Sequence, residues 1–325
     1  MIRVMFSMIL LALAGCDRPA APGGTVVLYS SIDDTYARMA CREFEGETGI
    51  HVDLVTDSEA AKSTGLVQRL IAEKAKPVAD VFWSGDPMRA FKLEVAGVGR
   101  IAATSGPARV RVIVYNTKLV AADQVPRRVA DLAGPEAAKR ACMANPLFGS
   151  TSLHAAALLQ MMGAEKAGAF FIEFVRNGGR MLASNGEVKR RVSSGEFAFG
   201  LTDSDDVAVA LGEGKPVGFV VPDQDEGDVG AVLVPAVPVV IHGAPHAEVA
   251  ERLAAWLAGE RMQQVLAESD AEFLPGSSDV KAVLKHLKLE RGALKAAAAM
   301  TAGTSAEFEA WEHCFLESWV AQQSR

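Results

Sequence analysis

Residues 184–211, SNGEVKRRVSSGEFAFGLTDSDDVAVAL, contain the signals of a helix, a strand and a second helix in direct succession. Ser184 precedes Glu187 by three residues, which is the spacing of a capping box and predicts that a helix begins there. Gly195 predicts the end of that helix. The alternation Phe-Ala-Phe-Gly-Leu over residues 197–201 predicts a strand with one face against the core. The segment is therefore typical of an α/β protein.

An acidic turn, TDSDD over residues 202–206, follows this strand directly. Ligands bind at the carboxyl ends of strands in open α/β sheets, so we expect ligand contacts from Asp203, Asp205 and Asp206. Carboxylates held within a few Å repel one another, which raises one pKa and favours the capture of a cation. The alternative is that Asp203, Ser204 or Asp205 only caps the helix that follows, because such side chains favour helix N-termini.

Length and charge limit the class of protein. The chain has 325 residues, half of them apolar, which is enough for two lobes with separate cores. The formal net charge is −7, and no run of lysine and arginine is dense enough to follow a phosphate backbone. The sequence therefore predicts no nucleic-acid partner, and its acidic balance mildly favours a cationic ligand.

Motifs that would indicate an enzyme are missing. The chain has no Gly-x-Ser-x-Gly, Cys-x-x-Cys or His-Glu-x-x-His motif. GEGK at residues 212–215 is not a phosphate-binding loop, because its glycine spacing is wrong and Pro216 replaces the required Ser or Thr. His242 and His246 are separated by Pro245, which argues against a zinc-binding pair on one helical face. We therefore predict that the protein is not an enzyme.

The N-terminus has the pattern of a secreted lipoprotein. Arg3 precedes an apolar run over residues 4–14, which is too short to span a bilayer but suits a signal peptide. Leu-Ala-Gly-Cys at residues 13–16 resembles the lipobox of bacterial lipoproteins. We therefore predict a signal peptide at residues 1–15, and lipid on Cys16 that holds the protein at a membrane surface. An ordinary signal peptide or a short hydrophobic tail is the alternative.

Residues 16–24, rich in Pro, Ala and Gly, are then expected to form a tether. Asp17 resembles the signal that retains lipoproteins at the inner membrane, which implies the periplasmic face of that membrane. Three further cysteines, Cys41, Cys142 and Cys314, cannot all pair internally. We expect Cys41 and Cys142 to be buried thiols, with one disulfide as the alternative in an oxidising compartment.

Strands and helices alternate at short spacing, which predicts βαβ units and a mostly parallel sheet. In its order of segments the chain resembles the ferric-iron branch of periplasmic solute-binding proteins, the receptor components of ABC importers. The resemblance is carried by TVVLYSS (25–31), EFEGETGI (43–50), EAAKSTGLVQRLIAEK (59–74), ADVFW (79–83), ARVRVIVYNT (108–117), ANPLFGSTS (144–152), the segment at 184–206 and FLPGS (273–277).

The resemblance implies the two-lobe α/β fold of type II periplasmic binding proteins. Each lobe is then a mixed, mostly parallel sheet flanked by helices, and two crossing segments form a hinge. We expect lobe 1 at residues 25–107 and 230–325, and lobe 2 at residues 108–229. The crossings are expected at about residues 108–114 and 229–240, with the C-terminal helices completing lobe 1.

The resemblance also implies the activity. The protein is expected to be a lipid-anchored, monomeric receptor that captures a small polar solute between the lobes and delivers it to an ABC permease with its ATPase. Fe³⁺ or a ferric chelate is the implied ligand, with a synergistic anion and no permanent cofactor.

Candidate ligand contacts lie on loops after strands or at helix starts. They are Ser30, Ser31, Glu59, Lys62, Ser150, Thr151, Ser152, Asp203, Asp205 and Asp206. We expect Asp205, Asp206 and Glu59 to hold the metal, because carboxylates suit hard cations. The helix start at residues 150–152 is expected to hold the anion. Helix capping is the alternative for the serines and the expected role of Asp86 before Pro87, and His154 is expected to be structural.

The chain departs from the family at the acidic turn. Many ferric-binding relatives carry two adjacent tyrosines where this chain has Asp205 and Asp206. Its only tyrosines are Tyr29, Tyr36 and Tyr115. A polyamine, or an organophosphonate bound at the turn before residue 150, is therefore an alternative ligand. A periplasmic enzyme and a structural lipoprotein without a ligand are the alternatives from other classes.

Overall fold

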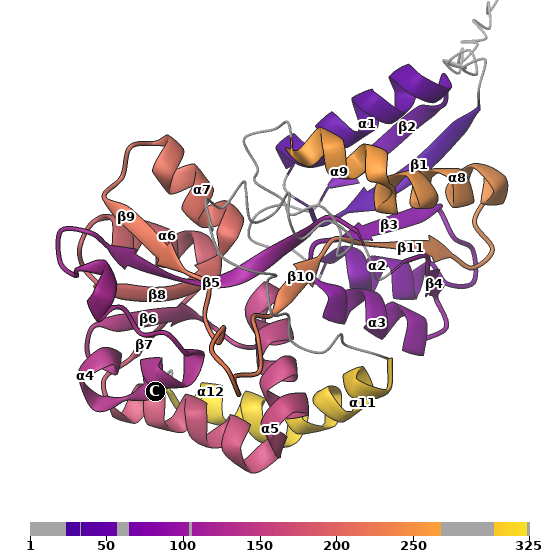
Figure 1. Cartoon of the computed structure of the whole chain (residues 1–325). Helices are drawn as coiled ribbons and strands as arrows, with labels where there is room; N and C mark the ends of the chain where they lie inside the picture. Colours follow the sequence, from indigo (N-terminus) through magenta and orange to yellow (C-terminus); the bar gives the residue numbers. More distant parts are fainter. Residues whose placement is uncertain (1–23, 33, 57–64, 104–105, 268–301, 324–325) are drawn as a thin grey trace, which may run out of the picture.

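The computed structural model describes residues 24–32, 34–56, 65–103, 106–267 and 302–323 of the chain (Figure 1). Cys16, Glu59 and Lys62 lie outside the described residues, as do the predicted signal peptide and the FLPGS segment. Within the described part, no helix combines the length and the apolar character needed to cross a membrane.

Two sheets, each flanked by helices, form two lobes, so the predicted fold class is confirmed. The elements of lobe 1 are β1 (Thr25–Ser30), α1 (Asp34–Thr48), β2 (His51–Thr56), α2 (Gly65–Ala72), β3 (Val81–Ser84), α3 (Pro87–Val95), β4 (Gly99–Ile101), β11 (Val237–Ile241), α8 (Ala247–Ala258) and α9 (Glu260–Ala267). Its strand order is β2-β1-β3-β11-β4. β1 is parallel to β2 and β3, whereas β11 is antiparallel to β3 and β4.

Lobe 2 contains the middle of the chain. Its elements are β5 (Ala108–Asn116), two 3₁₀ turns (Ala122–Gln124 and Val129–Ala133), α4 (Pro135–Ala138), β6 (Ala141–Ala144), α5 (Gly149–Arg176), β7 (Arg180–Leu182), α6 (Asn185–Ser193), β8 (Phe199–Asp203), α7 (Ser204–Gly212), β9 (Val217–Val220) and β10 (Leu233–Pro235). The strand order is β10-β5-β8-β6-β7, and β9 also pairs with β5. β6 is parallel to β7 and β8, while β5 is antiparallel to its partners.

The two segments that connect the lobes pair with each other. β5 leads from lobe 1 into lobe 2, and β10 leads back to β11 of lobe 1. They are antiparallel, with Leu233 opposite Val110 and Pro235 opposite Ala108. Both segments lie where the sequence predicted crossings. A hinge between the lobes would lie in these two segments.

The C-terminal helices depart from the expected lobe boundaries. We expected residues 230–325 to complete lobe 1, but α11 (Ala302–Trp311), a π-helical turn (Glu312–Leu316) and α12 (Glu317–Gln323) lie along α5 of lobe 2 (Figure 1). The reason is a shared aromatic core, in which the ring centroids of Trp319 and Phe171 are 6.0 Å apart. α11 also contacts α3, so this segment bridges both lobes.

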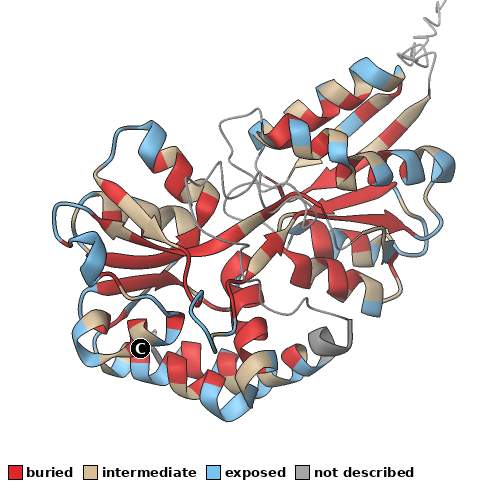
Figure 2. Ribbon diagram, viewed as in Figure 1, coloured by how far each residue is buried: buried red, intermediate tan, exposed pale blue. Residues whose placement is uncertain are grey.

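β8 is buried on both faces, whereas we expected only one face against the core. All five of its residues are buried because β8 lies between β5 and β6 and helices cover both sides (Figure 2). Phe199 and Leu201 pack into the core that contains α5. Gly200 faces α6, which begins after Ser184 and ends before Gly195, as predicted.

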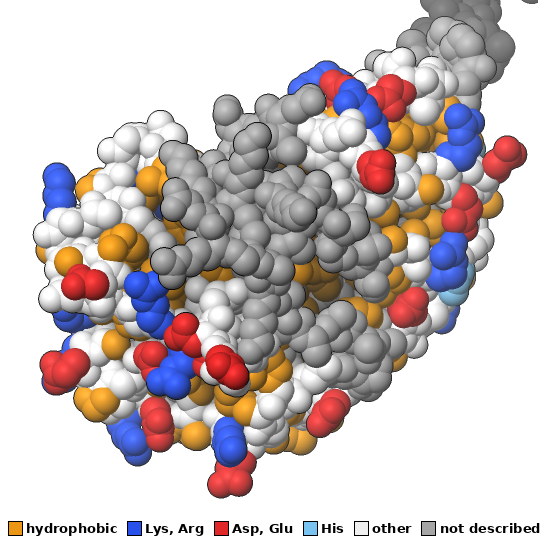
Figure 3. All heavy atoms as spheres, viewed as in Figure 1, with side chains coloured by type: hydrophobic (Ala, Val, Ile, Leu, Met, Phe, Trp, Pro, Cys, Tyr) orange, Lys and Arg blue, Asp and Glu red, His pale blue; other side chains and the backbone are white. Residues whose placement is uncertain are grey.

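The surface carries charges of both signs, and the described cysteines are free thiols. On the face shown in Figure 3, lysines and arginines are interspersed with acidic side chains and form no large patch. Cys41 and Cys142 are buried and Cys314 is exposed, and all three are free thiols. Burial raises the pKa of the Cys41 thiol to about 12, so this cysteine is unreactive.

We predict that Gly200→Ala destabilises the protein by about 1–3 kcal/mol, because overpacking strains a close-packed core. A Cβ at position 200 would meet Val188 Cγ1 at 2.5 Å and Val192 Cγ2 at 3.0 Å. The urea unfolding midpoint measures the change. Gly212→Ala is the control, since nothing lies within 4 Å of a Cβ there; an equal loss in both variants would contradict the packing described here.

Candidate functional site

A cleft of about 1080 Å³ lies between the lobes and receives side chains from both. Lobe 1 contributes residues from the turns after β1 and β3 and from α1. Lobe 2 contributes the starts of α5, α6 and α7. The lining includes Ser31, Tyr36, Asp86, Arg109, Phe148, Ser150, Asn185, Lys189, Arg190, Asp203, Asp205, Asp206, Glu213 and Lys215.

The acidic turn lies at the carboxyl end of β8, at the base of this cleft. One carboxylate oxygen from each of Asp203, Asp205 and Asp206 lies within 4.8 Å of the others. Simple helix capping does not account for the turn. Asp203 is the N-cap of α7 but makes no side-chain capping bond, and the Ser204 hydroxyl accepts a hydrogen bond from Val110 N instead.

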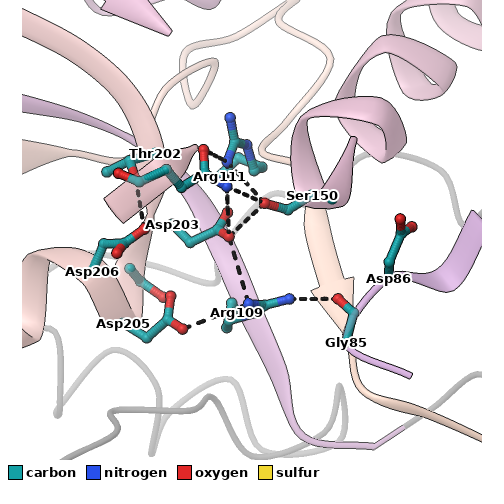
Figure 4. A network of polar contacts seen from close by, with 12 residues as sticks. Gly85, Asp86, Arg109, Arg111, Ser150, Thr202, Asp203, Asp205 and Asp206 are labelled. Carbon is teal, nitrogen blue, oxygen red and sulfur yellow. Dashed lines mark hydrogen bonds and ion pairs between the residues drawn. The ribbon is translucent and has the colours of Figure 1, made fainter. Parts of the chain in front are cut away.

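Asp203 is held by a buried arginine (Figure 4). Arg111 Nη1 donates to Asp203 Oδ1 at 2.7 Å, and both side chains are almost fully buried. The two residues lie opposite each other in the β5–β8 register. Ser150 Oγ at the start of α5 donates to Asp203 Oδ2 at 2.5 Å, and Asn185 Nδ2 at the start of α6 donates to Ser150 Oγ at 2.7 Å.

This network joins β5, the carboxyl end of β8 and the starts of two helices, α5 and α6. Arg111 Nη1 also donates to Asn185 Oδ1 at 3.1 Å, and Arg111 Nη2 donates to Thr151 Oγ1 at 3.3 Å. Because its carboxylate is engaged from both sides, Asp203 serves mainly to organise the site. Asp205 and Asp206 line the cleft, and Asp205 Oδ1 has no hydrogen-bond partner within the described part of the chain.

Arg109 provides a second positive charge and connects the lobes. Its Nη1 lies 3.6 Å from both Asp203 Oδ2 and Asp205 Oδ2. Its Nη2 donates to Gly85 O of lobe 1 at 2.6 Å (Figure 4). Arg109 and Arg111 are two residues apart on β5, so both side chains extend from one face of the hinge strand. Three carboxylates and two guanidinium groups leave one uncompensated negative charge when all are ionised.

The environment moves the pKa values of the three aspartates in different directions. Burial raises the pKa of Asp205 to about 7 against the opposing effect of Arg109, with Asp206 and Asp203 raising it further. Burial, followed by the charge of Asp203, also raises the pKa of Asp206, whose Oδ2 accepts a hydrogen bond from Thr202 at 2.7 Å. Burial opposes ionisation of Asp203, but Arg111 and Arg109 together hold its pKa below the usual range. A cation would therefore be favoured beside Asp205 and Asp206.

The predicted serine and threonine contacts divide into two groups. Ser31 and Ser150 line the cleft. Ser30, Thr151 and Ser152 are buried and are not part of its lining. Ser30 Oγ donates to Trp83 O at 3.3 Å, and Ser152 Oγ donates to Gly149 O at 2.9 Å. The Ser30 bond joins β1 to β3, and the Ser152 bond lies within the first turn of α5.

Asp86 and His154 have the structural roles that we expected. Asp86 caps α3, with its Oδ1 accepting from Met88 N at 3.0 Å and Pro87 at the first helical position. His154 is buried, and neither ring nitrogen has a hydrogen-bond partner among the described residues. Burial, with Arg111 as the next contribution, lowers the pKa of His154 to about 3, so the ring is neutral.

Several residues that line the cleft or lie directly behind it were not predicted. Arg111 and Asn185 complete the network around Asp203, while Tyr36 and Phe148 line the cleft from opposite lobes. A signal for Arg111 was present, since an arginine within an otherwise apolar strand needs a buried partner. Of the three tyrosines, Tyr36 lines the cleft, whereas Tyr29 is buried and bonded to Glu73 at 3.2 Å.

Comparison with known proteins identifies the family. Residues 25–269 match the family model described as "Bacterial extracellular solute-binding protein". The chain belongs to this family. No curated protein sequence matches the chain.

Solved structures that resemble this solute-binding protein share its fold at low sequence identity. The ferric binding protein from Campylobacter jejuni has a TM-score of 0.75 at 18% identity, covering 90% of this chain and 98% of that chain. The apo ferric ion-binding protein A of Pasteurella haemolytica has a TM-score of 0.74 at 20% identity, covering 88% and 95%. A Trichodesmium protein in complex with iron and citrate has a TM-score of 0.72 at 21% identity, covering 90% and 99%.

We predict that Asp203→Asn destabilises the solute-binding protein by about 3–5 kcal/mol, because it leaves Arg111 buried without its counter-charge. Denaturant unfolding at pH 7.5 measures the loss. The matched control is Glu251→Gln, which removes the exposed Arg100–Glu251 pair, 51% and 55% exposed, and should cost less than about 1 kcal/mol. Equal effects would show that the Arg111–Asp203 pair does not organise the site.

We predict that Asp205→Asn stabilises the ligand-free protein by about 1–3 kcal/mol at pH 8 and by less at pH 4.5. The folded-state pKa of Asp205, about 7, lies above its unfolded value. The wild type therefore loses stability as pH rises from about 4 to 7, and an asparagine, which cannot ionise, avoids this loss. Unfolding curves at several pH values provide the measurement. A stability difference that is independent of pH would contradict the raised pKa.

Proposed function

We propose that this protein is the substrate-binding receptor of an ABC importer, that it captures a ferric chelate between its lobes, and that it delivers the chelate to a membrane permease. Catalysis has no part in this function. Lipid on Cys16 would hold the receptor at the periplasmic face of the inner membrane, as the N-terminal sequence predicts.

The observation that carries the proposal is the pair Asp205 and Asp206 at the base of the cleft. Both carboxylates are oxygen donors suited to a hard cation. They lie within 4.8 Å of each other and of Asp203, whose own carboxylate is held by Arg111. Proteins with this fold that are described as iron-binding support the choice of metal.

The composition of the cleft favours a chelate over a bare ion. Two carboxylates cannot fill the coordination shell of Fe³⁺, and the cleft volume of about 1080 Å³ is far larger than one ion needs. Arg109 lies 3.6 Å from Asp205 and would repel an unaccompanied cation. A ligand that combines a metal with anionic groups satisfies both charges.

Closure of the lobes would complete the site. Ser31 and Tyr36 face the cleft from lobe 1, whereas Asp205 and Asp206 face it from lobe 2. The paired strands β5 and β10 allow the rotation that brings these groups together. The closed form, stabilised by ligand contacts to both lobes, is then the form that docks on the permease.

An organophosphonate is the second candidate. Arg109 and Ser150 line the cleft, and Ser150 lies at the start of α5, where free N–H groups favour an anion. Such a ligand would bind to these groups and would not depend on Asp205 or Asp206.

We predict that the double variant Asp205→Ala, Asp206→Ala loses the thermal stabilisation that ferric citrate gives to the wild type. At a ligand concentration of 100 Kd the expected stabilisation of the wild type is about 2.7 kcal/mol. Differential scanning fluorimetry with and without ferric citrate measures it. Asp123→Ala, at an exposed position outside the cleft, is the control and should respond as the wild type does. Retained stabilisation in the double variant would place the metal elsewhere.

A further inference from the structure

The C-terminal helices connect the two lobes outside the cleft. α11, the π-helical turn and α12, residues 302–323, run along α5 of lobe 2, and α11 also contacts α3 of lobe 1. We call this segment the C-terminal brace. None of its described residues belongs to the lining of the cleft. In Figure 1 the contact of α11 with α3 lies below the hinge strand β5, whereas α1 and α7, which flank the cleft, lie above it.

The brace is fixed to lobe 2 by a row of aromatic rings. The ring centroids of Trp311 and Phe315 are 5.4 Å apart, and those of Phe315 and Trp319 are 6.4 Å apart. Trp319 packs against Phe171 of α5. A Cβ at Gly168 of α5 would meet Phe315 Cζ at 3.1 Å, so the glycine lets this ring lie close to the helix backbone. The brace therefore moves with lobe 2.

The contact of lobe 1 with the brace is apolar. Met88 and Phe91 of α3, 6% and 4% exposed, belong to the same buried cluster as Phe308 of the brace and Leu153 of α5. By contrast, Leu93 of α3 packs in a cluster that consists of lobe 1 residues. α3 thus buries one side within its own lobe and another side against lobe 2.

Polar groups lie along the same contact. Arg89 Nη2 of α3 donates to Leu147 O, in the turn before α5, at 3.5 Å. Burial raises the pKa of Glu312 in the brace, and the charge of Arg89 is the largest effect that opposes this rise. Glu312 is therefore close to α3, and Arg89 lies between the brace and the turn before α5.

Rotation of the lobes about β5 and β10 must move α3 relative to the brace. Because this contact and the cleft lie on opposite sides of β5 (Figure 1), a rotation that closes the cleft separates α3 from the brace. The separation exposes Met88 and Phe91, which costs free energy because apolar surface returns to water.

We propose that the C-terminal brace opposes closure of the lobes, so that a ligand must offset the loss of the contact between α3 and the brace. Ligand affinity is then set partly from outside the cleft, because it depends on how readily the binding-competent form is reached. This inference rests on the lobe closure of the proposed function and does not depend on which solute the cleft takes.

The test weakens the contact from the lobe 1 side. Phe91→Ala should bind ferric citrate about tenfold more tightly than the wild type, because closure then breaks fewer contacts. Leu93→Ala is the matched control, since it removes a buried side chain of the same helix from the lobe 1 cluster; its affinity should stay within about twofold of the wild type. Isothermal titration calorimetry measures both. Phe308→Leu, a milder change from the brace side, should bind about threefold more tightly and replaces Phe91→Ala if that variant does not fold.

Small-angle X-ray scattering without ligand gives a second measurement, which is independent of the solute. Phe91→Ala should have a smaller radius of gyration than the wild type, and Leu93→Ala should not. Weaker binding by Phe91→Ala would overturn the inference, as would equal effects in both variants or no change in either measurement. If the wild type does not bind ferric citrate, the ferric function fails and the scattering alone decides the inference. Melting temperatures check that the variants are folded.

Discussion

The buried ion pair between Arg111 and Asp203 is the interaction on which the rest of the site depends. Neither charge is tolerable alone in the interior of lobe 2, so each fixes the other. Ser150 and Asn185, at the starts of α5 and α6, both accept from Arg111 Nη1, and Ser150 Oγ donates to Asp203 Oδ2. The pair thereby joins β5 and the carboxyl end of β8 to the starts of two helices.

The position of this pair explains why ligand binding and lobe movement can be coupled. Arg111 and Arg109 extend from the same face of β5, which is also a hinge strand. Arg109 contacts Asp205 on lobe 2 and Gly85 O on lobe 1. A cation at Asp205 would compete with Arg109 for that carboxylate. The occupancy of the acidic turn would in this way affect a contact between the lobes.

The sequence predicted local structure well and long-range packing less well. The helix after Ser184 and the acidic turn at a strand end follow from periodicity, capping and glycine positions, which are local signals, whereas the two crossing segments were placed by the resemblance to a family. The place of the C-terminal helices does not, because it depends on contacts such as Trp319 with Phe171, far apart in the chain.

In the site, too, local features were predicted and long-range contacts were not. Asp205 and Asp206 were predicted from their position after a strand, and they line the cleft. The sequence could not predict that Asp203, and not Asp205 or Asp206, would be paired with a buried arginine, because Arg111 comes from another strand. Lys189, Arg190 and Lys215 were not predicted to line the cleft. Only the packing of α6 beside α7 places them along one cleft.

Native mass spectrometry, combined with elemental analysis of protein purified without added chelator, tests the central claim most directly. The account predicts one iron per chain, accompanied by the mass of an organic polyacid. An organic solute without metal, or a chain that carries no ligand after exposure to ferric citrate, would contradict it.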